Sequence, residues 1–330
     1  MKTCTMKLAT TLAAALLLTT AAVQARAAAA EGSFDRTLKV TGPVDLDVTT
    51  GSGNIDVRTG DASSVHVSAK IRASNNWHFD SADAERKVHE LETHPPLEQN
   101  GNSIRIGRIE DPELRRNISI SYELEVPVET RLTAKTGSGN ETINGIHGPL
   151  RASTGSGTLR ISNLGDELEA ESGSGDIEAN SIKGHAHLHT GSGSIRGSAI
   201  AGSIVAGTGS GNIHLEQTAP GDVRLETGSG STEVTGVHGV LEARSGSGSI
   251  SASGNPTGSW TMHSGSGSLT VRLASPVGFD LDARTSSGQI ITDQPITVQG
   301  SIGHGHMQGK ARGGGARLDL ETGSGNIHIE

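Results

Sequence analysis

The residues of this chain best suited to bind a metal ion are histidines on one predicted strand. His185, His187 and His189 alternate with Ala186 and Leu188, which places the three imidazoles on one outer face. Alternate residues lie roughly 7 Å apart along a strand, which is wide for two ligands of one zinc ion, because each Zn–N bond is about 2.0 to 2.1 Å. We therefore predict polar surface histidines here, and we name His185 and His187 as candidate ligands.

Two further histidines lie in a glycine-rich segment, residues 302–315, which we predict to be a loop. His304 and His306 belong to it, and a loop could adapt its backbone around a metal ion more easily than a strand. These two residues complete the candidate metal ligands. No spacing among the candidates defines a site, so we predict neither a bound metal nor a cofactor.

The many serines lie in Gly-Ser-Gly segments and do not form the pattern of a catalytic nucleophile. No Gly-x-Ser-x-Gly elbow occurs, and no serine has an identifiable base with an orienting acid. A complete Gly-x-Gly-x-x-Gly or Walker loop, which would hold phosphate, is also missing. We therefore predict that Ser138 and its counterparts are turn residues, and that the chain has no catalytic or cofactor-binding residue.

The Gly-Ser-Gly segments recur at a fixed interval. The motif is Thr-Gly-Ser-Gly or a close variant, with outlying copies at Gly51 and Gly323 and a degraded Ser286-Ser287-Gly288. Its first glycines in the regular region are 18 or 19 residues apart, at Gly137, Gly155, Gly173, Gly191, Gly209, Gly228, Gly246 and Gly265. Such a period indicates small units that bury their apolar sides only by stacking on their neighbours. The repeat predicts a solenoid.

A period of 18 residues equals two nine-residue calcium repeats, so a calcium β-roll is an alternative. Those repeats place an aspartate at each glycine-rich turn, because Ca²⁺ prefers oxygen ligands. Only one carboxylate occurs among the eleven corresponding residues, which are Asn54, Asn140, Thr158, Asp176, Ser194, Asn212, Ser231, Ser249, Ser268, Gln289 and Asn326. This composition disfavours calcium inside the coil.

Apolar and polar side chains alternate on both sides of each turn, as in a half-buried strand. In one unit, Val223 and Leu225 alternate with Arg224 and Glu226 before the turn at residues 227–230. We predict that the apolar positions stack into the core. Before the turn these are Leu150, Ala152, Leu168, Ala170, Ala186, Leu188, Ile204, Ala206, Val223, Leu225, Leu241, Ala243, Trp260, Met262, Leu281, Ala283, Leu318 and Leu320. After the turn they are Leu159, Ile161, Ile177, Ala179, Ile195, Ile213, Leu215, Val234, Ile250, Ala252, Leu269, Val271, Ile327 and Ile329.

The outward positions carry charges that change sign from coil to coil. Equivalent residues on adjacent coils lie about 4.8 Å apart, so we predict one ladder through Arg160, Glu178, Arg196, His214 and Glu233. Arg151, Glu169 and His187 begin another. Threonines recur at one corner, as in ice-binding proteins, but the strand faces carry Arg, Glu and His, which disfavours that function.

Two sections break the repeat. We predict that residues 35–135 form the first coil and an N-terminal capping section with a short helix at Ser81 to Leu91, closed by Pro95-Pro96. A cap is expected because an uncovered solenoid end exposes a strand edge. Residues 136–330 form the repeat solenoid, with the loop near 302–315 before its last unit.

The first 25 residues have the features of a secretory signal peptide, with Lys2 and Lys7 ahead of an apolar stretch and a small-residue cleavage site. We expect residues 26–34 to be disordered. Without the signal, 25 basic and 36 acidic residues remain, so the net charge becomes −11 instead of −9. This charge disfavours nucleic acid as a partner. Cys4, the only cysteine, leaves with the signal, and no second apolar run could span a membrane.

A family likeness is carried by three features: the run Glu125-Val126-Pro127, the run Arg131-Leu132-Thr133-Ala134-Lys135-Thr136-Gly137-Ser138-Gly139, and the repeated Gly-Ser-Gly-x-Ile units that follow. On these residues the chain resembles the bacterial toast-rack domains of unknown function, labelled "putative adhesins", over roughly residues 35–330. The resemblance implies an all-β, single-chain, parallel β-helix-like solenoid displayed outside the cytoplasmic membrane, without an established catalytic residue.

We predict an exported, non-enzymatic β-solenoid, periplasmic or on the cell surface, that presents a regular surface to an envelope protein or a glycan. Self-association through the solenoid ends is a further possibility. The enzyme alternative is a polysaccharide lyase or hydrolase. Such an enzyme needs clustered carboxylates and aromatic residues for sugar stacking, whereas the repeat region has Trp260, Phe279 and little else aromatic.

Overall fold

A computed structural model describes residues 30–74, 81–274, 276–298 and 305–330. The predicted signal peptide and His304 lie outside these residues. Within them, the chain forms two large β-sheets and two helices, α1 (Ser81–Thr93) and α2 (Pro112–Arg115). Neither helix is long and apolar enough to span a bilayer.

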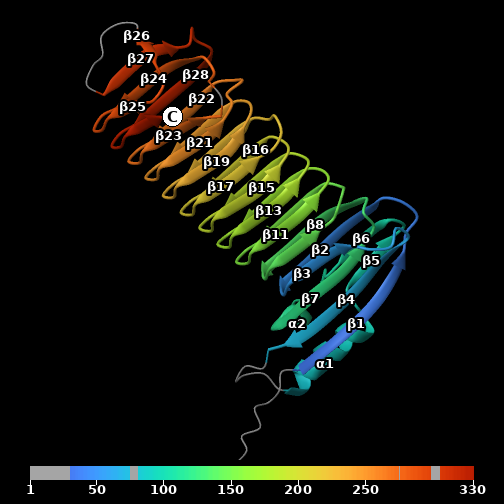
Figure 1. Cartoon of the computed structure of the whole chain (residues 1–330). Coiled ribbons are helices and arrows are strands. Elements are labelled where there is room, and N and C mark those ends of the chain that lie inside the picture. The colour runs from blue at the N-terminus through green and yellow to red at the C-terminus, as the bar shows by residue number, and fades with distance from the viewer. Residues whose placement is uncertain (1–29, 75–80, 275, 299–304) are drawn as a thin grey trace, which may run out of the picture.

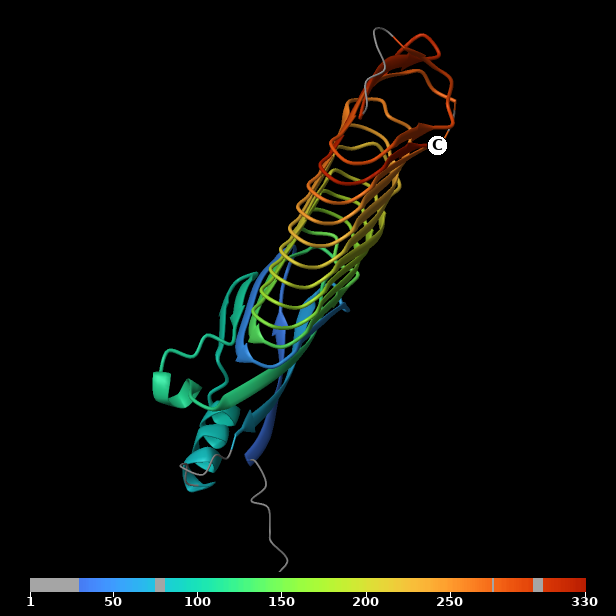
Figure 2. The ribbon, with the colours of Figure 1, turned by 90° about the vertical axis from the view of Figure 1, so that its left-hand side faces the viewer.

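The two sheets are the walls of an elongated stack of coils (Figures 1 and 2). Sheet A has 14 described strands, in the spatial order β1 (Ala30–Lys39), β4 (Ser64–Ala73), β7 (Ile118–Val126), β3 (Ile55–Thr59), β9 (Glu141–Asn144), β11 (Leu159–Leu164), β13 (Ile177–Ile182), β15 (Ile195–Ile200), β17 (Ile213–Gln217), β19 (Thr232–Val237), β21 (Ile250–Gly254), β23 (Leu269–Leu273), β29 (Ile327–Ile329) and β25 (Ile290–Thr292).

Sheet B has 15 described strands. Their order from the C-terminal end is β26 (Ile296–Val298), β27 (His306–Ala311), β24 (Phe279–Thr285), β28 (Ala316–Thr322), β22 (Trp260–Ser264), β20 (Leu241–Ser245), β18 (Val223–Thr227), β16 (Ile204–Thr208), β14 (Ala186–Thr190), β12 (Leu168–Ser172), β10 (Leu150–Thr154), β8 (Thr130–Ser138), β2 (Val44–Ser52), β6 (Ser103–Ile106) and β5 (Leu97–Asn100).

One coil is a sheet B strand, a Gly-Ser-Gly turn, a sheet A strand and a second corner. Consecutive regular coils pair in parallel with a register of 18 or 19 residues, so Leu150 lies beside Leu168 and Ile204 beside Val223. This arrangement confirms the predicted parallel solenoid. Within each strand, every second side chain faces inward, because successive side chains point to opposite faces of the sheet.

The core lies between the two sheets and runs the length of the stack. Every inward position predicted from the alternation is buried, from Leu150 to Ile329. A third aliphatic column, which the alternation does not predict, includes Leu164, Ile182 and Ile200. Each of these follows a residue with positive φ, namely Asn163, Ser181 and Ala199. The positive φ interrupts the alternation and returns the next side chain to the core.

The N-terminal section extends both sheets beneath the first coil. Strand β7 joins sheet A by parallel pairing with β3, and β4 and β1 follow it with antiparallel pairing. The β5–β6 hairpin continues sheet B. Helix α1 packs on β1 and β4 through Val88 and Leu91, and its Glu92 carboxylate accepts a hydrogen bond of 2.9 Å from the backbone N–H of Ser33 on the edge strand. The helix therefore covers an otherwise exposed strand (Figure 2).

The expectation of disorder over residues 26–34 is wrong for residues 30–34, which lie in β1. Phe34 is buried there, and its ring meets that of Tyr122 edge to face with centroids 6.5 Å apart. Residues 26–34 are rich in alanine and polar residues, which led to the expectation of disorder. Phe34 was the only local sign that this segment is ordered.

The C-terminal coils do not stack in chain order. The last coil of the chain, β28 and β29, lies between the coil of β22 and β23 and the coil of β24 and β25. The predicted glycine-rich loop at 302–315 is wrong for residues 306–311, which form β27 and pair antiparallel with both β24 and β26. Glycines in this segment allow close packing against β24 and β26, so their abundance did not indicate a loop.

Candidate functional site

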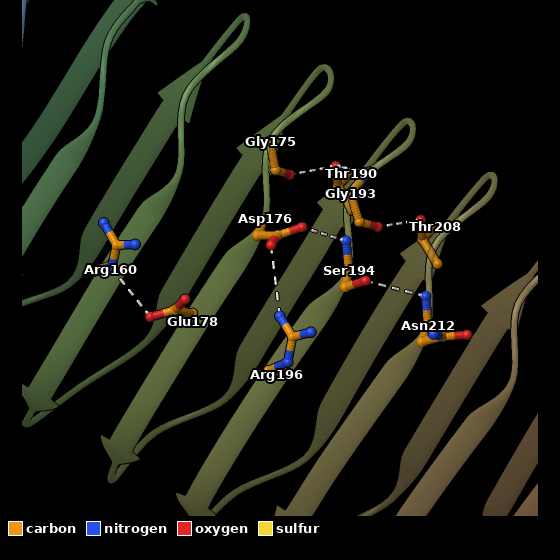
Figure 3. Close-up of polar contacts among 10 residues, drawn as sticks. All are labelled: Arg160, Gly175, Asp176, Glu178, Thr190, Gly193, Ser194, Arg196, Thr208 and Asn212. Carbon is orange, nitrogen blue, oxygen red and sulfur yellow. Dashed lines mark hydrogen bonds and ion pairs between the residues drawn. The ribbon is translucent and has the colours of Figure 1, made fainter.

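The hydroxyl groups of the turns hold neighbouring coils together. We call this set the turn-hydroxyl ladder, and its members are Thr136, Thr154, Ser172, Thr190, Thr208, Thr227, Ser245, Ser264, Thr285 and Thr322. The Thr190 hydroxyl donates to the Gly175 carbonyl of the preceding coil at 2.9 Å, and it accepts from the Gly193 N–H of its own turn at 3.2 Å. Thr208 repeats the contact with the Gly193 carbonyl at 2.8 Å (Figure 3).

All members of the turn-hydroxyl ladder are buried. They therefore cannot form the exposed threonine face of an ice-binding protein, and the Thr or Ser of the motif is explained by its position between two coils. Each hydroxyl satisfies a backbone carbonyl that would otherwise be unpaired in the interior, where such a group costs about 1–3 kcal/mol.

The positions compared above with calcium ligands form a second ladder of hydrogen bonds. A side-chain oxygen at this position accepts the backbone N–H of the equivalent residue one coil further on. Asp176 accepts from Ser194 at 2.8 Å, and the Ser194 hydroxyl accepts from Asn212 at 3.4 Å (Figure 3). We call this the acceptor ladder, and its other acceptors are Asn54, Asn140, Asn212, Ser249, Ser268 and Asn326. Eight of the eleven compared side chains thus bond to backbone of the next coil, and the second carboxylate oxygen of Asp176 pairs with Arg196.

The outer face of sheet A carries the charge ladder in the predicted register. Arg160 pairs with Glu178 at 3.2 Å, and His214 lies 3.1 Å from Glu233. Arg196 lies beside Glu178 in register but pairs instead with Asp176 at 3.5 Å (Figure 3). On sheet B, Arg151 pairs with Glu169 at 2.8 Å. These side chains are roughly half exposed, so each pair stabilises the fold by only about 0.2–1 kcal/mol.

The candidate histidines do not converge on one point. His185, His187 and His189 lie exposed at or beside β14, and the Nδ1 atom of His185 accepts from the Ser203 N–H at 3.3 Å. His306 lies in β27, with Nε2 3.1 Å from the Asp282 carboxylate. Among the residues that the structure describes, no group of three His, Cys, Asp or Glu side chains is placed to hold a metal ion.

Asp282 is the center of a charged cluster that the sequence did not reveal. Its carboxylate, on β24, is largely buried and is 2.8 Å from Arg284 and 3.8 Å from Arg317 as well as close to His306. Three basic side chains thus surround one carboxylate at the C-terminal end of sheet B. The cluster joins β24, β27 and β28, which is where the chain order of the coils is broken.

Glu141 is the most unusual titratable residue of the solenoid. It occupies the inward column of sheet A between Ile55 and Leu159, and it is fully buried. Neither carboxyl oxygen has a hydrogen-bond partner of ordinary geometry. Burial raises the pKa of Glu141 to about 8, and the nearby backbone amides of Ser153 and Thr136 only partly oppose this. The carboxyl is therefore mainly protonated at neutral pH.

A cleft of about 580 Å³ lies on the outer face of sheet A near its N-terminal end, where β1, β4, β7, β3 and β9 meet. Its charged side chains are mostly paired with one another or with a neighbour. His66 lies 3.2 Å from Asp35, and Lys70 lies 2.6 Å from Glu123. Arg58 contacts Glu125. The cleft is thus a polar surface whose charges largely satisfy each other.

Three solved structures are similar to this chain at low sequence identity. A putative cell adhesion protein from Clostridium sporogenes is 11% identical, with 91% of this chain and 99% of that chain covered and a TM-score of 0.22. A "putative adhesin" from Bacteroides fragilis is 12% identical, with 91% and 97% covered and a TM-score of 0.32. A "putative lipid binding protein" from Parabacteroides distasonis is 11% identical, with 89% and 96% covered and a TM-score of 0.27.

Superpositions with TM-scores this low carry no functional assignment. No curated protein matches the chain. The family model described as Toastrack DUF4097 matches residues 163–330, which is half of the chain and contains most of the regular coils. The chain belongs to the Toastrack DUF4097 family.

Proposed function

We propose that the protein is an exported, non-enzymatic interaction protein that presents the outer faces of its two sheets to an envelope protein or a glycan. The observation that carries this proposal is the regularity of those faces. Charged side chains recur in register on consecutive coils, as Arg160, Glu178, Arg196 and His214 do on sheet A. Their spacing of about 4.8 Å offers a linear or extended partner many equivalent contacts.

The groups that could do chemistry have structural roles, which supports a non-enzymatic function. The turn hydroxyls bond to backbone of neighbouring coils, and the acceptor ladder does the same. Several outer carboxylates pair with basic residues, as Glu178 does with Arg160. A polysaccharide lyase or hydrolase is the competing candidate, and it requires carboxylates that are free to act on a sugar.

Export rests on the N-terminal sequence. Residues 1–25 have a basic start, an apolar stretch and a small-residue cleavage site, the order found in secretory signals. The destination we propose is the periplasm or the cell surface.

The test is a binding experiment with two charge-swapped variants of the mature chain, residues 26–330. Arg160→Glu with Glu178→Arg reverses one pair on sheet A, and Arg151→Glu with Glu169→Arg reverses one on sheet B. Each swap keeps the net charge and the ion pair, so the fold should be retained. The probes are isolated cell envelopes, peptidoglycan and a glycan panel. We expect wild-type capture, reduced at least fivefold by the swap on the face that docks and unchanged by the other.

A parallel assay incubates the same polysaccharides with the protein and measures newly formed chain ends. Release of chain ends that increases with the concentration of the protein would contradict the non-enzymatic proposal. Capture that neither swap alters would contradict the proposed role of the ladders.

A further inference from the structure

A second hollow lies on sheet B at the N-terminal end, and its lining carries more basic than acidic residues. It has a volume of about 460 Å³ and lies between β2, β6 and the segment that leads from β6 through α2. Three arginines line it, Arg105, Arg108 and Arg115, with Asp47 as its only acidic residue. We call this hollow the arginine groove.

The three arginines are unpaired. Among the residues that the structure describes, no carboxylate lies within ion-pair distance of any of these guanidinium groups, and none of them donates a hydrogen bond. Arginines elsewhere in this section do have partners, as Arg72 has Glu31 at 3.1 Å and Arg116 has Glu113 at 3.7 Å. The groove therefore gathers three arginines outside ion-pair distance of a carboxylate in a chain whose net charge is −9, although Asp47 and Glu98 flank Arg105 on the neighbouring strands.

The fold places these cations side by side. Parallel pairing of β2 with β6 sets Arg105 beside Asp47, and pairing of β2 with β8 sets Lys135 beside Thr49, which lines the groove. Strand spacing puts the Lys135 backbone about 4.8 Å from the Thr49 backbone.

The backbone leading to Arg108 is held close to β2. Gly107 has a φ of +85°, and a side chain there would collide with the Thr49 carbonyl. The Gly107 N–H donates to the Pro96 carbonyl at 2.8 Å. The approach of this segment to β2 fixes one wall of the groove, so Arg108 stays near Arg105 rather than moving away from it.

We propose that the arginine groove binds a phosphate-bearing ligand. Clustered like charges repel each other, and a dianion removes that repulsion by accepting hydrogen bonds from several guanidinium groups at once. Arginine presents donors in a planar fork that matches phosphate oxygens in pairs. The Thr49 hydroxyl donates to the Asp47 carboxylate at 3.4 Å, so the three guanidinium groups supply the donors. The volume is that of a small-molecule site rather than of a bare ion, so the phosphate would be part of a phosphorylated small molecule or of a lipid headgroup.

The groove shares an outer row of sheet B with one charge ladder, because Asp47 lies beside Thr133 and Thr133 beside Arg151. The proposal does not depend on the proposed function, because the groove can bind its ligand whether or not the ladders dock a partner. The two sources of phosphate are separated by the probes. Calorimetric titration of the mature chain with inorganic phosphate and with glycerol 3-phosphate measures the soluble source. Co-sedimentation with phosphatidylcholine vesicles, with and without phosphatidic acid, measures the lipid source.

The variant is Arg105→Gln with Arg108→Gln and Arg115→Gln. The matched control is Arg36→Gln with Lys183→Gln and Arg312→Gln, three exposed basic residues outside the groove, so both proteins lose three positive charges. Circular dichroism and thermal unfolding establish that both variants remain folded. We expect wild type to bind at least one phosphate probe saturably, with affinity that falls as salt rises.

We further expect the groove variant to bind at least tenfold more weakly and the control to bind within about twofold of wild type. Asp47→Asn should bind more tightly, because it removes the only carboxylate of the lining. The proposal is overturned if wild type binds none of the probes, if the groove variant binds as wild type does, or if the control loses as much affinity as the groove variant.

Discussion

Replacing Glu141 with leucine should stabilise the solenoid, and the gain should grow with pH. Leucine restores the aliphatic column, since the residues beside Glu141 on adjacent strands are Ile55 and Leu159. The carboxyl oxygens have no hydrogen-bond partner of ordinary geometry. A buried polar group without a partner costs about 1–3 kcal/mol even when it is uncharged, so Glu141→Leu should already be more stable than wild type at pH 5.

The pH dependence follows from the pKa of Glu141, which rises from an ordinary 4.5 to about 8 in the folded chain. Below pH 4.5 the carboxyl is protonated in both the folded and the unfolded state. Between pH 4.5 and 8 the unfolded state releases the proton while the folded state keeps it, so the free energy of unfolding falls as pH rises. Each pH unit in this window costs about 1.4 kcal/mol, and above pH 8 the loss is complete. The stability of Glu141→Leu relative to wild type should therefore increase by about 4 kcal/mol between pH 5 and pH 9.

Urea unfolding followed by circular dichroism, at pH values from 5 to 9, measures this difference. Urea is uncharged and leaves the electrostatics unscreened. Because a stack of coils can unfold in parts, hydrogen exchange of the amides in β8 to β11 should accompany it. Comparing variant with wild type cancels the titration of the histidines, which both proteins share.

Thr232→Ile is the matched control. Thr232 lies in the same column, between Ile213 and Ile250, and its buried hydroxyl also lacks a partner. Its replacement should stabilise the chain by an amount that does not vary with pH, because threonine does not titrate in this range. A Glu141→Leu gain that is equally flat from pH 5 to pH 9 would refute the assignment of a raised pKa to a buried carboxyl.

Three smaller perturbations test the other contacts by the same unfolding assay. Thr208→Val removes a hydroxyl that bonds to two backbone groups and should cost about 2 kcal/mol or more, whereas Thr208→Ser should cost under about 1 kcal/mol; equal losses would contradict the ladder. Ala199→Gly should stabilise the chain by about 0.5 to 1 kcal/mol, because alanine there has a φ of +53°. Gly236→Ala should destabilise it by about 2 kcal/mol, because φ is +73° and a side chain would meet the Gln217 carbonyl. The opposite signs would refute the argument from backbone strain. Arg160→Ala, which breaks the exposed pair with Glu178, should cost less than about 1 kcal/mol and less still at high salt, and a larger cost would show that the pair does more than fix register.

The core was predictable because two periods agree. Alternation within a strand gives the inward side chains, and the 18-residue repeat places them above one another, so Trp260 and Met262 could be assigned although they differ in size from the residues below them. The same superposition places Glu141 between Ile55 and Leu159. It was overlooked because β9 is short and polar in sequence, and only alignment with neighbouring coils reveals its inward position.

The third aliphatic column was missed for a different physical reason. Leu164, Ile182 and Ile200 follow residues in the left-handed region, which reverses the direction that simple alternation predicts. Apolar residues at an 18-residue spacing were the available sign. The arginine groove could not be predicted at all, since Asp47 and Arg105 are brought together by pairing of strands distant in the chain, which no local pattern encodes.

The ends of the stack explain where the repeat motif decays. An interior turn needs glycine at its first position, because a side chain at Gly323 would collide with the Gly265 carbonyl of the adjacent coil. Ser286 occupies this position in the coil that is last in space, although it is not last in the chain. On its far side this coil meets the antiparallel strand β27 instead of another coil with a glycine turn, and it keeps the bond from the Thr285 hydroxyl to the Gly325 carbonyl at 2.9 Å.

The opposite end meets the same requirement with different residues. The Thr50 hydroxyl of the first coil has no preceding glycine turn, and it donates instead to the Ile120 carbonyl of β7 at 2.8 Å. The irregular N-terminal section therefore supplies the acceptor that a further coil would have supplied. The physical rule behind both ends is that each turn hydroxyl needs a carbonyl from the layer beneath it, so the motif follows the spatial order of the coils. The motif is intact at residues 50–53 in the first coil and decays at residues 286–288, in the coil that is last in space rather than in the chain.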